Sequence, residues 1–457
     1  MSAPVPASSQ VDIADVIDRS KVGSLQIMLF ALSAACLIMD GFDVQAVGYV
    51  GPSLIREWKI PGSTLGNMLA SGNFGVLVGS LVFTMVADKI GRRPVLIAAT
   101  LYFSALTIVT GMVTSVEQMI LVRFVAGLGL GCIIPNATAL IGEYSPRRLR
   151  IALMATISVG FTAGAAFGGF VSAWLIPAFG WRSVFYFGGA VPLVIAGLMI
   201  WWLPESLQFM ALRGRKNRDR LAAWLRRIDS TVPVTANTEY VIHEENRGGV
   251  PAMHLFREGR AVGTVLLWVI NFMNIFNLYV LSGWMPTVAA QLGYSTRMAV
   301  MMGTTVQVGG TLGTFWLTWL IGRFGFVHVL TPCFTVACIS IALIGQPGLT
   351  PWLLFLIVFI AGSCVVGGQP TVNALSGSYY PTYLRSTGIG WGLGIGRAGA
   401  IIGPWLVGQF MAAKWSIHDI FYASAIPALI SAMVMLSLHW VMRLTTSRAR
   451  PSEVVAH

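Results

Sequence analysis

Long apolar segments fill nearly the whole chain, and short polar loops separate them. Twelve of these segments reach about 20 residues, the length at which an α-helix crosses the hydrocarbon core of a bilayer. We expect helices at 25–50, 66–86, 95–113, 119–141, 151–175, 184–203, 262–282, 298–320, 327–345, 352–374, 386–410 and 420–442. An α-helix forms all of its backbone hydrogen bonds within its own segment, and a segment in lipid needs this because lipid offers its backbone no hydrogen-bonding partner. The sequence therefore predicts an all-α integral membrane protein with twelve transmembrane helices.

The composition supports a lipid environment and argues against several kinds of partner. Only 11% of the 457 residues are charged and 55% are hydrophobic, whereas a soluble domain carries about 25% charged residues. The net charge of +12 does not indicate a nucleic-acid partner, because the basic residues lie in the gaps between apolar segments. The five cysteines fall inside apolar segments without metal-ligand or disulfide spacing. We expect a monomer surrounded by lipid, without a bound metal or nucleic acid.

The basic residues are unevenly divided between the two sides of the expected membrane. With the first segment running outward, 23 Lys and Arg lie on the side of the N-terminus and five lie on the other side. Because cytoplasmic loops carry the excess of positive charge, both termini are predicted to face the cytoplasm. The expected organisation is a cytoplasmic segment 1–24, a six-helix half 25–203, a basic cytoplasmic loop 204–260, a second six-helix half 261–442 and a cytoplasmic tail 443–457.

The two halves of the chain repeat each other at an offset of 234 to 235 residues. Asp40 and Asp43 correspond to Asn274 and Asn277, so one half carries titratable groups where the other carries neutral amides. Further matched pairs are Pro52 with Pro286, Pro135 with Pro370, Tyr144 with Tyr379, Gly164 with Gly399 and Gly168 with Gly403. Repeats of this kind in transporters place a binding site at their interface, near the middle of the membrane.

Two aspartates and two arginines lie inside the expected helices. Charged groups are costly in a bilayer, so such residues are functional by default and need partners. Asp40 and Asp43 lie on roughly one face of the first segment, in the same half of the membrane as Arg123 of the fourth. We expect the aspartates to carry a coupled proton, with Asp43 as the principal carrier and Asp40 assisting. The alternative is a fixed ion pair that serves folding alone.

Arg397 lies near the middle of the eleventh segment, and its planar guanidinium matches a carboxylate. It is the predicted anchor for a substrate carboxylate, with Arg123 as a second candidate, and pairing with a protein acid is the alternative. Other polar or aromatic residues within apolar segments could line a substrate cavity: Asn274, Asn277, Gln369, Asn373, Trp391 and Tyr279. Helix packing or lipid contact is the alternative role for each of them.

The loop after the second segment carries a charged motif that reads Asp88-Lys89-Ile90-Gly91-Arg92-Arg93. It resembles the signature loop of the major facilitator superfamily, although Thr84 stands where that family has glycine. The resemblance covers about residues 20 to 445 and implies two pseudo-symmetric six-helix halves. We expect a group of charged residues at helix ends to act in gating: Asp88, Arg92, Arg93, Glu143, Arg150 and Arg385. The alternative is that they serve only membrane topology or solvation of helix ends.

Two narrower motifs resemble one branch of that superfamily, the aromatic acid:proton symporters. Asp40-Gly41-Phe42-Asp43 is similar to the branch's Asp-Gly-x-Asp signature, and Gly396-Arg397-x-Gly399 is similar to part of its eleventh helix. The resemblance implies proton-coupled import of a small aromatic carboxylate, a hydroxylated or methoxylated benzoate-type acid, across a bacterial inner membrane by alternating access. It implies no cofactor besides the proton as coupling ion.

Other functions fit the residues less well. The six histidines lie in loops or near helix ends without metal-ligand spacing, which argues against a membrane enzyme. The sequence has no nucleotide-binding loop, which argues against direct ATP drive, and 204–260 is too short and basic for a signalling domain. A symporter of another organic acid or of a sugar, and an exporter of aromatic acids, remain the alternatives.

Overall fold

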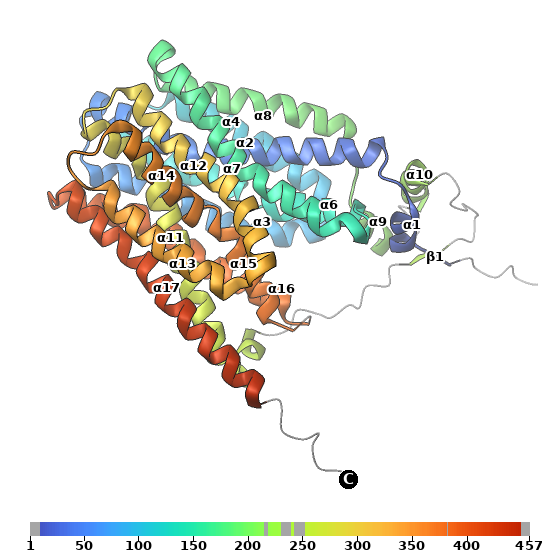
Figure 1. Ribbon diagram of the computed structural model, residues 1–457. Helices are drawn as coiled ribbons and strands as arrows, with labels where there is room; N and C mark the ends of the chain where they lie inside the picture. Colours follow the sequence, from blue (N-terminus) through green and yellow to red (C-terminus); the bar gives the residue numbers. More distant parts are fainter. Residues whose placement is uncertain (1–9, 214–217, 230–238, 242–251, 382, 449–457) are drawn as a thin grey trace, which may run out of the picture.

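The computed structural model describes residues 10–213, 218–229, 239–241, 252–381 and 383–448. Every predicted membrane segment is helical (Figure 1). The N half consists of α2 (Ser24–Trp58), α3 (Gly62–Ile90), α4 (Arg92–Met112), α5 (Val116–Leu130), α6 (Ile133–Tyr144), α7 (Arg147–Phe179) and α8 (Arg182–Trp202). The C half consists of α11 (Ala261–Gln291), α12 (Thr296–Phe324), α13 (Phe326–Ile344), α14 (Pro351–Val365), α15 (Gly368–Tyr379), α16 (Arg385–Ala412) and α17 (Ile417–Arg448).

Most of these helices are suited to lipid by their own composition. Among the described residues, ten helical spans are long and apolar enough to cross a membrane. The remaining two, α12 and α16, have 29 and 28 residues but are more polar. Each packs against the other half, α12 on α7 and α16 on α3. Protein therefore covers their polar and glycine-rich faces, and the twelve-helix prediction is confirmed although two helices are less apolar.

The fourth and tenth predicted segments are each interrupted in the middle, which the sequence analysis did not anticipate. The first break lies at 131–132, between α5 and α6, and the second at 366–367, between α14 and α15. Pro135 lies four residues after the start of the first break, and Pro370 lies four residues after the start of the second. A proline ring clashes with the carbonyl four residues earlier and donates no hydrogen bond to it. The matched prolines therefore explain why both halves break at equivalent positions.

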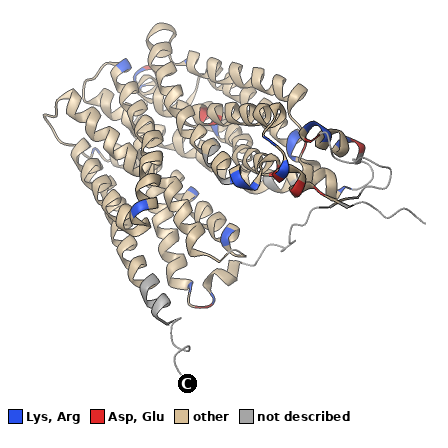
Figure 2. Ribbon diagram, turned by 45° about the vertical axis from the view of Figure 1, so that its right-hand side comes forward, with Lys and Arg blue, Asp and Glu red and all other residues tan. Residues whose placement is uncertain are grey.

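Short elements gather at one end of the bundle, which we call the basic end. They are β1 (Gln10–Asp12), α1 (Ile13–Arg19), α9 (Leu207–Leu212), α10 (Arg218–Ile228), β2 (Glu239–Val241) and the 3-10 helix η2 (Ala252–Phe256). The strands β1 and β2 pair in parallel, with Gln10 opposite Glu239. Figure 2 shows most Lys and Arg residues at this end. We call the other end, where 59–61 and 292–295 connect helices, the opposite end.

Glycines let helices within each half approach at matched positions. A Cβ on Gly164 of α7 would lie 2.0 Å from the carbonyl oxygen of Ile38, and one on Gly399 of α16 would lie 2.5 Å from that of Phe272. Both distances are far below van der Waals contact, so only glycine fits without moving a helix. The repeat is therefore visible in the packing as well as in the sequence.

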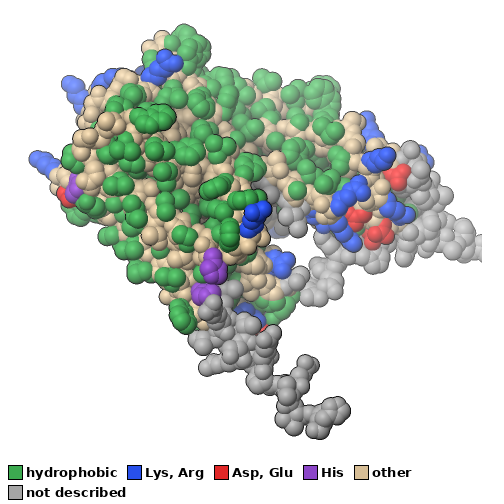
Figure 3. Space-filling view, in the orientation of Figure 1, with side chains coloured by type: hydrophobic (Ala, Val, Ile, Leu, Met, Phe, Trp, Pro, Cys, Tyr) green, Lys and Arg blue, Asp and Glu red, His purple; other side chains and the backbone are tan. Residues whose placement is uncertain are grey.

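The two halves meet at the opposite end and diverge toward the basic end (Figure 1). In the described part of the chain, several hydrogen bonds join the halves, among them the following three. Asn73 Nδ2 donates to Ala400 O (3.1 Å), Gln307 Nε2 donates to Gln45 Oε1 (3.4 Å), and Gln45 Nε2 donates to Ser282 O. These contacts hold the halves together at the opposite end, whereas the halves stand apart at the basic end. On the outside of the bundle, the face drawn in Figure 3 is largely covered by hydrophobic side chains.

Candidate functional site

A buried ion pair lies at the centre of the N half. Arg123 of α5 donates from Nη1 to Asp43 Oδ1 (3.1 Å) and from Nη2 to Asp43 Oδ2 (2.9 Å), so the guanidinium grips both carboxylate oxygens. Thr107 of α4 also donates to Asp43 Oδ1 (2.7 Å). The carboxylate is 0% and the guanidinium side chain 3% exposed. The pairing expected from the sequence is present, and it ties three helices together with no net charge.

A second acid and base face each other across the halves without closing into a pair. Asp40 lies one turn before Asp43 on α2 and is buried, whereas Arg397 of α16 is only partly buried. Arg397 interacts electrostatically with both Asp40 and Tyr279 of α11. Among the described residues neither Asp40 nor Arg397 makes an ion pair or a side-chain hydrogen bond. A guanidinium in this setting has its donors free for an anion that enters between the halves.

The C half holds a cluster of four carboxamides where the N half holds its acids. Asn274 Nδ2 donates to Gln369 Oε1 (2.7 Å), and Gln369 Nε2 donates to Asn271 Oδ1 (3.1 Å) and Asn373 Oδ1 (3.2 Å). Asn274 Nδ2 also donates to Val365 O (3.1 Å), a carbonyl at the break between α14 and α15. Gln369 therefore fixes the orientation of its neighbours. Sequence reasoning found all of these residues except Asn271.

Two residues predicted to bind substrate lie outside this group. The Asn277 carboxamide faces α17, where its nitrogen donates to Ser424 O (2.8 Å) and its oxygen accepts from Ala428 N (3.1 Å). Trp391 stacks on Trp268 with ring centroids 5.9 Å apart. A spacing of three helical residues is a net rotation of about 60°, and across this angle Asn274 reaches Gln369 while Asn277 reaches α17. Both residues serve helix packing here, the alternative left open by the sequence.

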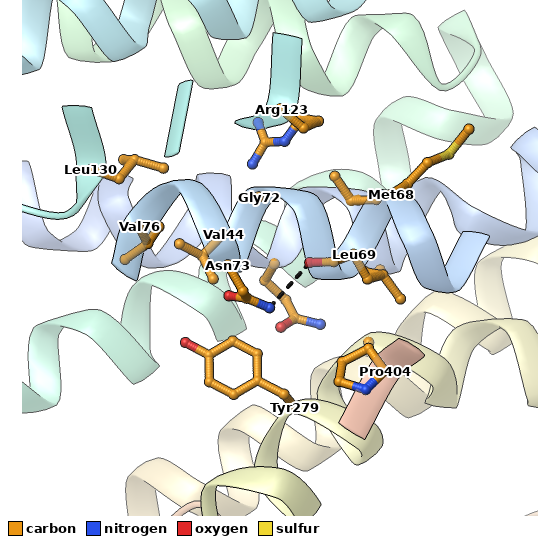
Figure 4. A pocket seen from close by; sticks show the side chains of 14 residues that line it. Val44, Met68, Leu69, Gly72, Asn73, Val76, Arg123, Leu130, Tyr279 and Pro404 are labelled. Atoms are coloured by element: carbon orange, nitrogen blue, oxygen red, sulfur yellow. Dashed lines mark hydrogen bonds between the residues drawn. The ribbon is translucent and has the colours of Figure 1, made fainter. Parts of the chain in front are cut away.

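A narrow pocket marks the closed side of the interface (Figure 4). Gln45, Asn73, Arg123, Tyr279 and Pro404 contribute to its lining, and Asn73 points toward Tyr279. The pocket volume of about 20 Å³ is the room that one water molecule needs, so an aromatic acid does not fit there unless the halves separate. Gln45 and Asn73 escaped the sequence analysis, although an uncharged amide inside an apolar segment is itself a signal of a polar partner.

The predicted gating residues form a network confined to the N half. Arg92 Nη1 lies 2.8 Å from Glu143 Oε1, and Ser206 Oγ donates to Glu143 Oε2 (2.7 Å). Glu205 Oε1 accepts from the backbone nitrogens of Arg92 (3.0 Å) and Arg93 (3.1 Å), and thus caps α4. A carboxylate is favourable at this position because it accepts from the free backbone N–H groups and faces the positive end of the helix dipole, and the sequence analysis did not assign Glu205 to the gate.

Among the described residues, Arg385 and Arg150, two other predicted gating residues, have no ion-pair partner across the halves. Arg385 is exposed at the start of α16, and Arg150 is partly exposed near the start of α7. In the described part of the chain, neither makes an ion pair. Asp88 lies on α3, but its side chain is outside the described residues. This arrangement agrees with a basic end at which the halves stand apart.

A large hollow lies on the outer face of the C half. It measures about 1000 Å³ and is lined by α12, α13 and α14, with Trp316, Arg323 and His328 among its residues. Most of the lining is apolar, and none of it belongs to the acid, base and amide groups between the halves. We therefore place the candidate site at the interface and not in this groove.

Comparisons with known proteins agree with this architecture. The model of the Major Facilitator Superfamily matches residues 33–238 and 267–456. The chain is 35% identical over 432 residues to the 4-hydroxybenzoate transporter PcaK of Acinetobacter baylyi, covering 93% of this chain and 94% of that protein. It is 33% identical over 433 residues to a gallate transporter of Pseudomonas putida, covering 94% and 96%.

Solved structures match the fold at low sequence identity. The crystal structure of a D-xylose-proton symporter has a TM-score of 0.70 and 16% identity, over 91% of this chain and 97% of that chain. A bacterial homologue of the lysosomal transporter Spinster has a TM-score of 0.69 and 16% identity, over 92% and 98%. At this identity the likeness concerns the fold alone. The family match and the relatives together show that the chain is a membrane transporter, not an enzyme, and that it belongs to the major facilitator superfamily.

Proposed function

We propose that this chain imports a small aromatic carboxylate together with a proton, by alternating access across a bacterial inner membrane. The observation that carries the proposal is Arg397, a partly buried guanidinium between the halves with no ion pair among the described residues, facing Asp40. Relatives that align with more than 90% of this chain are named as transporters of 4-hydroxybenzoate and gallate. Both compounds are aromatic carboxylates.

The carboxylate of the substrate binds to the guanidinium of Arg397. A planar fork pairs with both oxygens of a carboxylate, which a point charge cannot do. Tyr279 interacts with the same guanidinium and offers a ring against which an aromatic substrate can pack. Arg123, the second candidate anchor, is already occupied by both oxygens of Asp43, so its role is to hold the N half together.

The proton is carried by Asp40, which reverses the order expected from the sequence. Asp43 is held by Arg123 and Thr107, and protonating it would leave a buried guanidinium without its counter-charge. Asp40 has no such partner, and the charge it faces, Arg397, is the one that a substrate carboxylate neutralises. A bound substrate carboxylate therefore neutralises the charge that Asp40 faces, which favours a proton on Asp40.

The repeat supports this role for Asp40. Asn274, its counterpart in the C half, donates to Val365 O at the break in the tenth segment. A protonated carboxyl can donate a hydrogen bond through its O–H, as a carboxamide does through its N–H groups, and the N half has its own break at 131–132. Protonated Asp40 is thus able to donate to a carbonyl of this break in the way that Asn274 does. Asn274 represents the permanently neutral form of the same position.

The basic end is assigned to the cytoplasm because it carries most of the Lys and Arg residues. Both termini then lie inside the cell, and the structure corresponds to a state open to the inside. Closure of the basic end would bring Arg385 of the C half toward Arg150 and the network of Arg92 and Glu143 in the N half. These residues form the inner gate, while the bonds of Asn73 and Gln45 close the outer side.

Transport in proteoliposomes tests the proposal. Labelled 4-hydroxybenzoate should accumulate when the outside is acidic, and an uncoupler should abolish the accumulation. Arg397→Lys should weaken binding at least tenfold, whereas Arg323→Lys, on the outer face of α12, should bind as the unmodified chain does. Accumulation of a sugar or an aliphatic acid in place of aromatic acids would overturn the proposal. So would outward pumping under the same gradient.

A further inference from the structure

We infer that the groove on the outer face of the C half binds an anionic phospholipid of the cytoplasmic leaflet. The phosphate lies at Arg323 and His328, and an acyl chain lies along the apolar lining. This surface is away from the interface where the substrate is proposed to bind. The inference takes from the proposed function only the assignment of the basic end to the cytoplasm.

The groove exists because α12 and α13 both pack on α14 and contact each other less. A Cβ on Gly309 of α12 would lie 2.4 Å from the carbonyl oxygen of Phe359, and one on Gly313 would lie 2.5 Å from that of Ser363. These glycines bring α12 directly against α14, and Phe359 and Ser363 belong to the lining. The floor of the groove is therefore α14, and its walls are α12 and α13.

The walls present apolar side chains to the surroundings of the protein. Leu312, Trp316 and Leu320 follow one another at intervals of four on α12, as Pro332 and Val336 do on α13, so each set lies on one face of its helix. Leu312 and Trp316 are more than half exposed. Because these helices lie in the membrane, an apolar and exposed lining of this kind meets lipid chains.

The length of the groove matches one leaflet of the bilayer. On α12 the lining runs from Leu312 to Arg323, eleven residues further along, which is a rise of about 16 Å. Half of the hydrocarbon core is about 15 Å thick. Since α12 ends at Phe324, at the basic end, an acyl chain whose headgroup lies at Arg323 reaches Leu312 near the middle of the membrane.

The basic end of the groove carries positive charge without an acid to balance it. Arg323 and His328 are exposed, and the lining contains neither Asp nor Glu. Within residues 252–448 the acids are Glu258, which pairs with Arg260 (2.6 Å), and Asp419 at the opposite end. In the described part of the chain, Arg323 has no ion pair, so an anion from outside the protein is its natural partner.

The local geometry suits a phosphate. The guanidinium of Arg323 lies over the ring of Trp319, with Cζ 4.7 Å from the centroid, and this contact leaves its N–H groups free for phosphate oxygens. Gly325 precedes α13 without a side-chain cap, so the positive end of that helix is available. A Cβ at Gly325 would meet nothing within 4 Å, which leaves room for a headgroup. His328 adds a ring N–H donor.

An anionic phospholipid satisfies the charge and the apolar groove together. A helix of a second copy of this chain would fill the apolar part and leave Arg323 without an anion. A free aromatic acid supplies the anion and leaves most of the length of the groove empty. Anionic lipids give the cytoplasmic leaflet its negative surface potential, and a zwitterionic headgroup carries a cation of its own, so the groove selects lipids with a net negative charge.

Photolabelling of the purified chain in detergent tests the inference. Phosphatidylglycerol and phosphatidylcholine carry the same photoreactive group in one acyl chain, and mass spectrometry locates the labelled peptides. Phosphatidylglycerol should label residues 312–336 about fivefold more than phosphatidylcholine, the effect of one arginine near an anionic lipid. Arg323→Gln should abolish this preference. Arg297→Gln, which removes an exposed arginine at the other end of the same helix, should keep it.

Each result decides for or against the groove as a lipid site. Equal labelling by the two lipids, or an equal loss of preference in both variants, would overturn the inference. So would suppression of the labelling by free 4-hydroxybenzoate, or a groove that neither lipid labels, as a second copy of the chain would leave it. Selective labelling that only Arg323→Gln loses supports it. The proposed transport function stands in every case, because its test concerns Arg397.

Discussion

Replacing Asp40 by asparagine should convert the chain from a concentrating transporter into one that only equilibrates its substrate. The substitution keeps the size of the side chain and its capacity to donate a hydrogen bond. It removes the carboxylate that faces Arg397 and fixes that position in the neutral form, as Asn274 is in the other half. A site that cannot bind and release a proton cannot couple substrate transport to the proton gradient.

The size of the effect follows from the charge balance. One pH unit across the membrane is worth about 1.4 kcal/mol per proton, so transport of one proton with each carboxylate accumulates substrate up to about tenfold at zero potential. Without the proton, a potential of 100 mV, negative inside, opposes entry of the anion by about 2.3 kcal/mol, about a fiftyfold exclusion. The two mechanisms thus differ by orders of magnitude in the ratio they reach.

The assay is uptake of labelled 4-hydroxybenzoate into proteoliposomes with a gradient of one pH unit and the potential clamped at zero. The unmodified chain and Asp419→Asn, an exposed substitution at the opposite end, should approach the tenfold ratio. Asp40→Asn should stop at a ratio of one while still exchanging internal for external substrate. If Asp40→Asn reaches the tenfold ratio, Asp40 is not the carrier, and the interpretation of the structure is wrong.

Three further predictions concern stability and gating. Asp43→Asn leaves Arg123 buried without a counter-charge and should destabilise the folded protein by about 3 to 5 kcal/mol; an unchanged unfolding midpoint of the purified variant would contradict this. Asn73→Leu removes the bond to the carbonyl of α16 and should shift the equilibrium toward opening at the opposite end by about 2- to 12-fold, measured as longer distances between spin labels in the two loops there. Arg92→Gln breaks the pair with Glu143 and should slow transport with little change in substrate affinity; weaker binding at an unchanged maximal rate would argue against a gating role.

Much of the fold could be predicted from the sequence because lipid imposes simple rules. An apolar segment of about 20 residues must be a helix, and the twelve segments are helices with longer ends than expected, as in Ser24–Trp58. The matched positions of Asp40 with Asn274 and of Gly164 with Gly399 indicated two equivalent halves, which the packing bears out. The breaks at 131–132 and 366–367 were not predicted, although Pro135 and Pro370 were aligned. The hydropathy of a segment does not reveal the backbone hydrogen bond that a proline cannot donate.

The sequence by itself determined which groups must find partners, since an unpaired charge or amide in lipid is costly whatever the arrangement of helices. It singled out Asp40, Asp43, Arg123 and Arg397 for that reason. Only the tertiary structure decided the pairing: Arg123 takes Asp43 from a segment 80 residues earlier, and Asp40 is left facing Arg397. Which partner a side chain finds depends on the rotation of each helix about its axis and on the distance between helices. On α11, a rotation of about 60° separates Asn274, which joins the amide cluster, from Asn277, which contacts α17. Neither quantity is encoded in local composition, because both result from the packing of all twelve helices at once.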